Sequence, residues 1–179
     1  VEFPILFRNN REAWDSRNWI EILDQHRGTW FDTGKWSGFA DPRILGHEHN
    51  WAFPGSSTSQ IKSQLNNRWN FWWTRDLQSQ IRGSAERVVI FAGGNDIDRY
   101  YPSIYNGKPA APYINPIRDN LKWIVDYVRK VKGTIPIALV SVPHVGCTPD
   151  IQSAHPTDAV KTQRVTAALD LSRTMRFDP

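Results

Sequence analysis

The chain has 179 residues, 40% of them hydrophobic and 22% charged, which fits one globular domain over residues 1–179 rather than a disordered or fibrous protein. Its single cysteine, Cys147, excludes an internal disulfide bond, and no segment approaches the roughly 18 uninterrupted apolar residues of a membrane span. The 22 basic and 18 acidic residues give a net charge of +4, but the two signs are interspersed, so we expect no nucleic-acid partner.

Helical and strand-like segments alternate along the chain, a pattern typical of a parallel sheet with crossover helices. Apolar positions at helical spacing from Ser16 predict a first short helix that ends near Gly28. Residues 32–54 are polar and irregular. Ser57 and Gln60 then have the spacing of a capping box, which predicts the start of a second helix. The apolar stripe of that helix is Ile61, Leu65, Trp69 and Trp72.

A continuous apolar run over residues 87–92 predicts a strand buried on both faces, and Gly93 and Gly94 end it. We expect residues 100–112 to form a loop. Asn115 and Pro116 then predict an N-cap followed by proline at the first helical position. The apolar face of this third helix, which should end at Gly133, is Ile117, Leu121, Ile124, Val125 and Val128.

A second apolar strand is predicted over residues 135–142, with Pro136 tolerated at its start. The loop 143–149 follows, and residues 158–175 carry apolar positions that predict a final helix. In an α/β sheet, a helix at this position is ordinarily followed by a further strand. We therefore expect the architecture to be cut short at its C-terminal end.

Three segments are expected at the carboxyl ends of the strands, where ligands bind in open parallel sheets. In the first, after the strand 87–92, Asn95 can donate its side-chain N–H₂ to a developing oxyanion. Gly94 and Asp96 flank it as candidate binding residues, and the alternative is that Asn95 and Asp96 only cap a loop or a helix. In the second, Gly55 ahead of a capped helix lets backbone N–H groups approach a ligand.

The third segment, residues 143–149, brings His144 and Cys147 near the same crevice as a candidate binding residue and a thiol. No histidine–asparagine pattern accompanies Cys147, so a buried apolar role is favoured over a nucleophilic one. His47 and His49 flank one glutamate, but no third ligand stands at a recognisable spacing. We therefore predict no metal site and no cofactor.

Together these segments resemble the GDSL/SGNH family of serine ester hydrolases. The matching residues are 50–56 (Asn-Trp-Ala-Phe-Pro-Gly-Ser) and 91–96 (Phe-Ala-Gly-Gly-Asn-Asp), and residues 16–23 look like the first helix of bacterial members. The resemblance implies a three-layer, flavodoxin-like α/β fold with helices on both faces of a parallel sheet. It also implies an oxyanion hole formed by the Gly55 N–H and the Asn95 side chain.

Two departures from the family pattern concern the catalytic triad. The nucleophile of the family is the serine of Gly-Asp-Ser, which this sequence lacks, and Ser16 stands where the first helix should begin. The family histidine follows a fifth strand in Asp-x-x-His, whereas Asp150 and His155 are five residues apart and follow the fourth strand. His155 is therefore a doubtful general base. We expect the chain to lack its first and last strands, and with them the nucleophile and the base.

The resemblance predicts a serine esterase whose substrate is a small acyl ester or an acylated carbohydrate, although this chain alone should be inactive. The sequence does not determine the cellular compartment, although export is favoured. The alternative is a non-catalytic carbohydrate-binding or interaction module on the same fold. A solvent-facing row of Trp36, Trp51 and Trp73 would favour this alternative, because exposed tryptophans stack on sugar rings.

Overall fold

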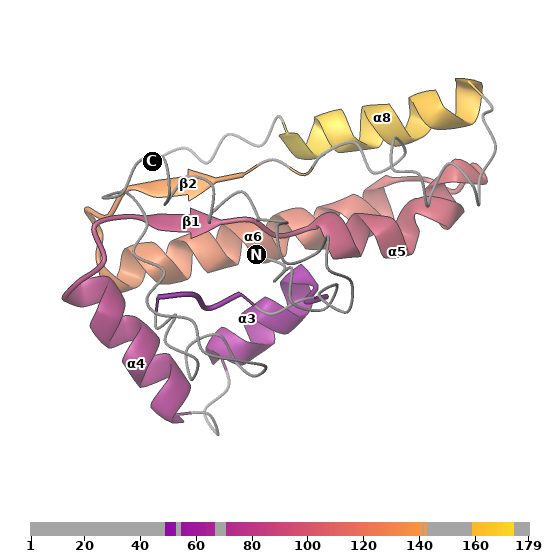
Figure 1. Cartoon of the computed structure of the whole chain (residues 1–179). Helices are drawn as coiled ribbons and strands as arrows, with labels where there is room; N and C mark the ends of the chain where they lie inside the picture. The colour runs from indigo at the N-terminus through magenta and orange to yellow at the C-terminus, as the bar shows by residue number, and fades with distance from the viewer. Residues whose placement is uncertain (1–48, 53–54, 67–70, 141, 143–158, 174–179) are drawn as a thin grey trace, which may run out of the picture. The chain divides into compact units, whose positions relative to one another are not determined.

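The computed structural model describes residues 49–52, 55–66, 71–140, 142 and 159–173. The chain divides into two compact units, Val1–Ser56 and Ser57–Pro179. The described helices and strands all belong to the second unit, which is α/β (Figure 1). In chain order they are α3 (Thr58–Asn66), α4 (Phe71–Arg82), β1 (Val88–Ile90), α5 (Gly94–Tyr105), α6 (Ala111–Val131), β2 (Ile137–Leu139) and α8 (Ala159–Arg173). The helix predicted from Ser16 lies outside the described residues.

Strands β1 and β2 pair in parallel, with Val88 opposite Ile137 and Ile90 opposite Leu139. Parallel strands need a long crossover connection, and α5 and α6 supply it. Both strands lie inside the predicted ranges but are shorter. The prediction that this strand is buried on both faces was wrong: Ile90 is 8% exposed, whereas Phe91, just beyond β1, is 40% exposed. Successive side chains of a strand point to opposite faces, and only the face of Ile90 is packed in the core.

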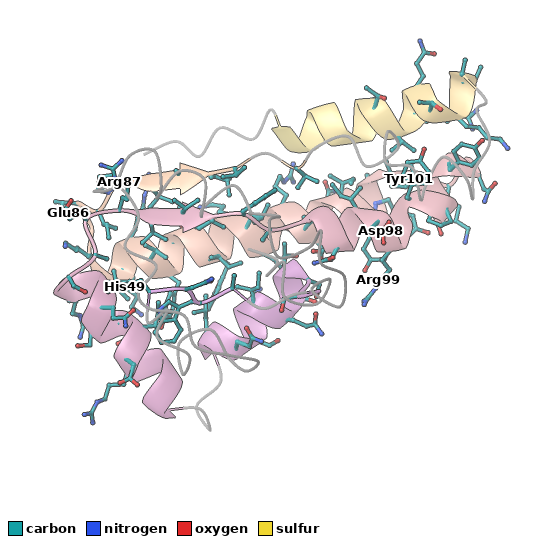
Figure 2. All side chains as sticks on the ribbon, in the orientation of Figure 1. His49, Glu86, Arg87, Asp98, Arg99 and Tyr101 are labelled. Atoms are coloured by element: carbon teal, nitrogen blue, oxygen red, sulfur yellow. The ribbon has the colours of Figure 1, made fainter. Side chains whose placement is uncertain are left out.

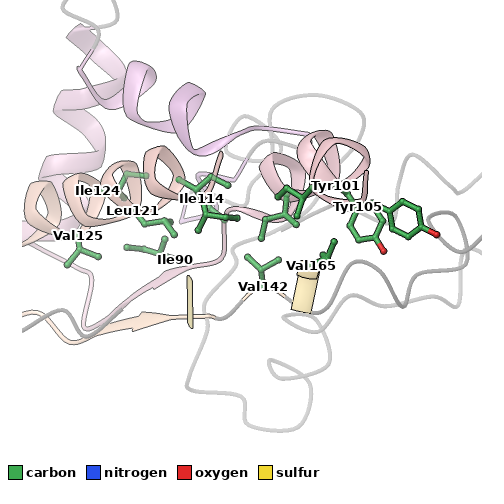
Figure 3. Close-up of a cluster of buried hydrophobic side chains, with 13 residues drawn as sticks. Ile90, Tyr101, Tyr105, Ile114, Leu121, Ile124, Val125, Val142 and Val165 are labelled. Atoms are coloured by element: carbon green, nitrogen blue, oxygen red, sulfur yellow. The ribbon is translucent and has the colours of Figure 1, made fainter. Parts of the chain in front are cut away.

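Helix α6 provides the largest part of the core, and its predicted apolar face is confirmed. The five predicted positions are all buried: Ile117, Leu121, Ile124, Val125 and Val128. Figure 3 shows Leu121 and Val125 beside Ile90 of β1, in the cluster that also contains Val142. The helix ends at Val131, two residues before Gly133, as the sequence indicated. In the described part of the chain, no helix is both long and apolar enough to cross a membrane.

The loop predicted over residues 100–112 is confirmed only for residues 106–110, because α5 runs to Tyr105 with Pro102 inside it and α6 begins at Ala111. Side chains at helical spacing explain this outcome: Ile97, Tyr101 and Ile104 are each 1–2% exposed. Their burial stabilises the helix by roughly 1.5–3 kcal/mol per side chain, which offsets the cost of about 3 kcal/mol for an interior proline. Pro102 itself is exposed.

The predicted start of α6 at Asn115 was also wrong, because the helix begins at Ala111 and contains Pro116. Pro112 occupies the first turn, where the missing N–H costs nothing. The additional turn places Ile114 in the core at 5% exposure. This burial explains why the helix starts before Asn115.

The capping box at the start of α3 is confirmed. The Gln60 side chain accepts a hydrogen bond from the Ser57 N–H at 2.8 Å, and the Ser57 hydroxyl accepts one from the Gln60 N–H at 3.3 Å. The apolar stripe that was predicted on one helix is not on a single helix, since α3 ends at Asn66 and α4 begins at Phe71. Ile61 and Leu65 pack against the core. Trp69 and the Trp72 side chain lie outside what the structure describes.

The final helix is confirmed as α8, close to the predicted range. Val165 is 1% exposed and joins the core cluster, while Val160 is 58% exposed. The ammonium group of Lys161 lies 4.9 Å from the ring centroid of Tyr105. These contacts pack α8 against α5.

Replacement of Gly93 by alanine is expected to destabilise the protein by about 1–3 kcal/mol. Gly93 has φ +105°, and a Cβ there would lie 3.1 Å from a methyl carbon of Val142 and 3.5 Å from one of Ile117. Urea unfolding of Gly93→Ala and wild type would measure the change in the free energy of unfolding.

The matched control is Gly94→Ala. Its Cβ would meet only Val142 at 4.0 Å, and its φ is not positive. Alanine is favoured over glycine in helices, so Gly94→Ala should be neutral or stabilising by up to about 1 kcal/mol. Equal effects of the two substitutions would contradict the assignment of a required left-handed turn to Gly93.

Candidate functional site

The asparagine and the aspartate that the sequence singled out, Asn95 and Asp96, lie at the start of α5, which follows β1. Gly93 is buried, adopts a left-handed conformation and is the N-cap residue of α5. Its carbonyl accepts the first helical hydrogen bond, from the Ile97 N–H at 3.0 Å. Gly94, Asn95 and Asp96 therefore form the first turn of α5, directly after the strand.

Asp96 is buried at 6% exposure and is bonded to the start of α3. One carboxylate oxygen accepts a hydrogen bond from the Thr58 N–H at 2.8 Å, and the other accepts one from the Thr58 hydroxyl at 2.9 Å. Thr58 is fully buried, at 0% exposure. The alternative prediction, that Asp96 caps a helix, is thus confirmed, but the capped helix is α3 and not α5, to which Asp96 belongs.

A third helix joins this cluster through Asn120 of α6. The Asn120 amide donates to the Thr58 hydroxyl at 3.3 Å, while that hydroxyl donates to Asp96. The hydroxyl is therefore both donor and acceptor. One polar chain connects α6, α3 and α5 inside the second unit.

Sequence reasoning missed Thr58, although a signal was present. A capping box satisfies the N–H groups of its first and last residues, here Ser57 and Gln60. The N–H of Thr58 lies between them in the first turn and has no acceptor within its own helix. Since Thr58 is buried, that N–H needs an acceptor from elsewhere in the chain, and Asp96 supplies it.

Asn95 is exposed, in contrast to the buried Asp96 beside it. It lies in the first turn of α5, where the backbone N–H groups give the helix end a partial positive charge. A carboxamide donor and a positive helix end both favour an anionic or developing negative oxygen. Chemically, this turn suits the stabilisation of an oxyanion.

Gly55 has φ +74° and is exposed, with open space where a Cβ would lie. The left-handed conformation agrees with the choice of glycine at this position. Gly55 belongs to the first unit and Asn95 to the second. A cavity shared by the Gly55 N–H and the Asn95 side chain stays a prediction.

The remaining candidates for the triad and its surroundings lie outside the described residues. These candidates are Ser16, His144, Cys147, Asp150 and His155. Trp36 and the Trp73 side chain lie outside as well, whereas Trp51 is half-buried. The solvent-facing tryptophan row thus stays untested as a whole.

His49 is exposed, and His47 lies outside the described residues. Within the described ranges, no three histidine, cysteine, aspartate or glutamate side chains are placed to hold a metal ion.

Comparison with protein-family models, with curated proteins and with solved structures gives no match to this chain. The resemblance to SGNH hydrolases consequently rests on the residues quoted above.

Replacement of Asp96 by alanine is expected to destabilise the protein by about 2–5 kcal/mol. The change leaves the Thr58 N–H and the Thr58 hydroxyl without their acceptors in a buried position, and each unsatisfied donor costs about 1–3 kcal/mol. Chemical unfolding monitored by circular dichroism would measure the loss.

Asp98→Ala is the matched control, because Asp98 is an exposed aspartate on the same helix (Figure 2). Surface substitutions of this kind usually change stability by less than about 0.5 kcal/mol. If Asp96→Ala proved as mild as Asp98→Ala, the contact with Thr58 would not be holding α3 and α5 together.

Proposed function

We propose that this chain is part of a serine ester hydrolase of the SGNH type, acting on a small acyl ester or an acylated carbohydrate. The proposal includes the three-layer, flavodoxin-like architecture, in which β1 and β2 are two adjacent strands of a larger parallel sheet. The observation that carries it is the turn after β1, where an exposed Asn95 stands beside an Asp96 that is buried and bonded to Thr58 at the start of α3.

In such an enzyme, a serine attacks the ester carbonyl and a histidine takes its proton as general base. The carbonyl oxygen becomes negatively charged in the tetrahedral intermediate. Donors that already point at this oxygen stabilise the transition state without reorganisation. Asn95 would donate from its side-chain N–H₂ and Gly55 from its backbone N–H.

The proposal assigns the nucleophile and the base to residues other than those of this sequence. No Gly-Asp-Ser occurs in the 179 residues, and the spacing of Asp150 and His155 departs from Asp-x-x-His. The 179-residue chain by itself should therefore hydrolyse no aryl ester above background.

The experiment that tests the proposal is Asn95→Ala in the protein that carries this chain together with its flanking residues. Loss of one oxyanion donor lowers kcat by about 10²–10³-fold, whereas KM should change little. Steady-state hydrolysis of p-nitrophenyl acetate would measure both constants.

Asn115→Ala is the matched control, since Asn115 is an exposed asparagine on α6. It should leave kcat unchanged. Absence of esterase activity in the wild-type protein, or an Asn95→Ala variant as active as Asn115→Ala, would overturn the proposal. Turnover by the 179-residue chain that disappears in Ser16→Ala would instead identify Ser16 as the nucleophile.

His155 offers a second, independent prediction. If the base follows a fifth strand, His155→Ala in the extended protein retains most of kcat, and His144→Ala acts mainly on substrate binding. The pH dependence of kcat and KM for both variants would check this. A thousandfold or greater loss of kcat in His155→Ala, the scale for losing a triad member, would make His155 the base.

A further inference from the structure

We infer that Asp96 is a positioning residue for Asn95: its bonds to Thr58 fix the side of α5 from which the exposed Asn95 side chain projects. This inference rests on the proposed function for its catalytic consequence. The geometry behind it lies wholly within the second unit and involves α3, α5 and α6.

The contact between Asp96 and Thr58 fixes orientation as well as position. Both oxygens of one carboxylate accept from two donors of the same residue, at 2.8 and 2.9 Å. Because each oxygen has its own donor, rotation of the carboxylate would break at least one of the two bonds. Burial at 6% for Asp96 and 0% for Thr58 means that water does not replace a lost bond at low cost.

Helix geometry carries this constraint to Asn95. Consecutive residues of an α-helix are about 100° apart around the axis. Asp96 is bound to α3, and the next residue, Ile97, is buried at 1% exposure in the core. With two successive side chains fixed, the rotation of the first turn about its axis is set, and Asn95 is held on the exposed side.

The frame that holds Asp96 is itself anchored. Asn120 of α6 donates to the Thr58 hydroxyl, and its neighbour Leu121 is buried in the core. The partners of Asp96 are therefore tied to the most extensively packed helix rather than to a loop. A donor that has to meet a developing oxyanion needs such support, because a displacement of about 1 Å costs up to about 10²-fold in rate.

Thr58→Val tests the inference in the protein with its flanking residues. Valine keeps the branched shape of threonine but removes the hydroxyl donor to Asp96 and the acceptor for Asn120. We expect kcat to fall about 10- to 100-fold while KM changes less than about threefold, both measured per active site well below the melting temperature. A purely structural role would lower the melting temperature and leave kcat per folded molecule unchanged.

Thr58→Ser is the conservative rescue, because serine retains both the hydroxyl and the N–H. It should recover most of kcat even if it lowers stability. If Thr58→Val does not fold, Asn120→Ala takes its place. This substitution removes only the hydrogen bond from Asn120 to the Thr58 hydroxyl, and we expect a smaller fall in kcat.

A readout without turnover separates this inference from the proposed function. In ¹⁵N relaxation measurements, Thr58→Val should lower the order parameter of the Asn95 side-chain amide, while that of Asn106 at the other end of α5 stays constant. An inactive wild type with this NMR response would overturn the esterase and keep the positioning role. If a folded Thr58→Val protein kept both its kcat and the order parameter of the Asn95 side-chain amide, the positioning role would be overturned.

Discussion

The buried start of α3 presents an amide proton that its own helix cannot satisfy, and much of the described site follows from how the chain meets this need. Thr58 is fully buried, so leaving its N–H unpaired would cost about 1–3 kcal/mol. Asp96, 38 positions along the chain, accepts both this N–H and the hydroxyl of the same residue. The bond brings the first turns of α3 and α5 together.

The position of Asp96 depends in turn on the left-handed glycine after β1. With φ +105° and two methyl groups close to where a Cβ would lie, Gly93 lets the chain pass from strand to helix in a connection of only three residues, 91–93. A longer connection would shift every residue of the first turn of α5. The same turn that packs against Val142 and Ile117 thus sets the position from which Asp96 reaches Thr58 of α3.

Much of the fold was accessible from the sequence because apolar periodicity is a local signal. Both strands, the buried face of α6 and the capping box at Ser57 were predicted from neighbouring residues alone. Two errors fall at prolines. Pro102 lies inside α5, where a loop was expected, and Pro116 lies inside α6, where the helix was expected to begin; the burial of tyrosine and isoleucine side chains outweighs the local cost of these prolines.

The candidate site shows a different limit. Asn95 and Asp96 were selected from the tetrapeptide after β1, and the structure places them in one helical turn. Their division into an exposed and a buried residue was not accessible, because it depends on Thr58 and Asn120, which lie far away in sequence. Single-sequence reasoning identifies residue types suited to a task, whereas the direction of a side chain is set by tertiary partners.

A carboxylate directly beside a proposed oxyanion donor also requires an electrostatic explanation. An unscreened negative charge near Asn95 would oppose the developing charge that the carboxamide is meant to stabilise. Asp96, however, faces the start of α3, where the helix dipole places about +0.5 charge, and its two oxygens are occupied by Thr58 donors. This arrangement partly compensates the charge of the carboxylate at the start of α3. The bonds that orient Asn95 are therefore the same bonds that make its acidic neighbour compatible with an anionic transition state.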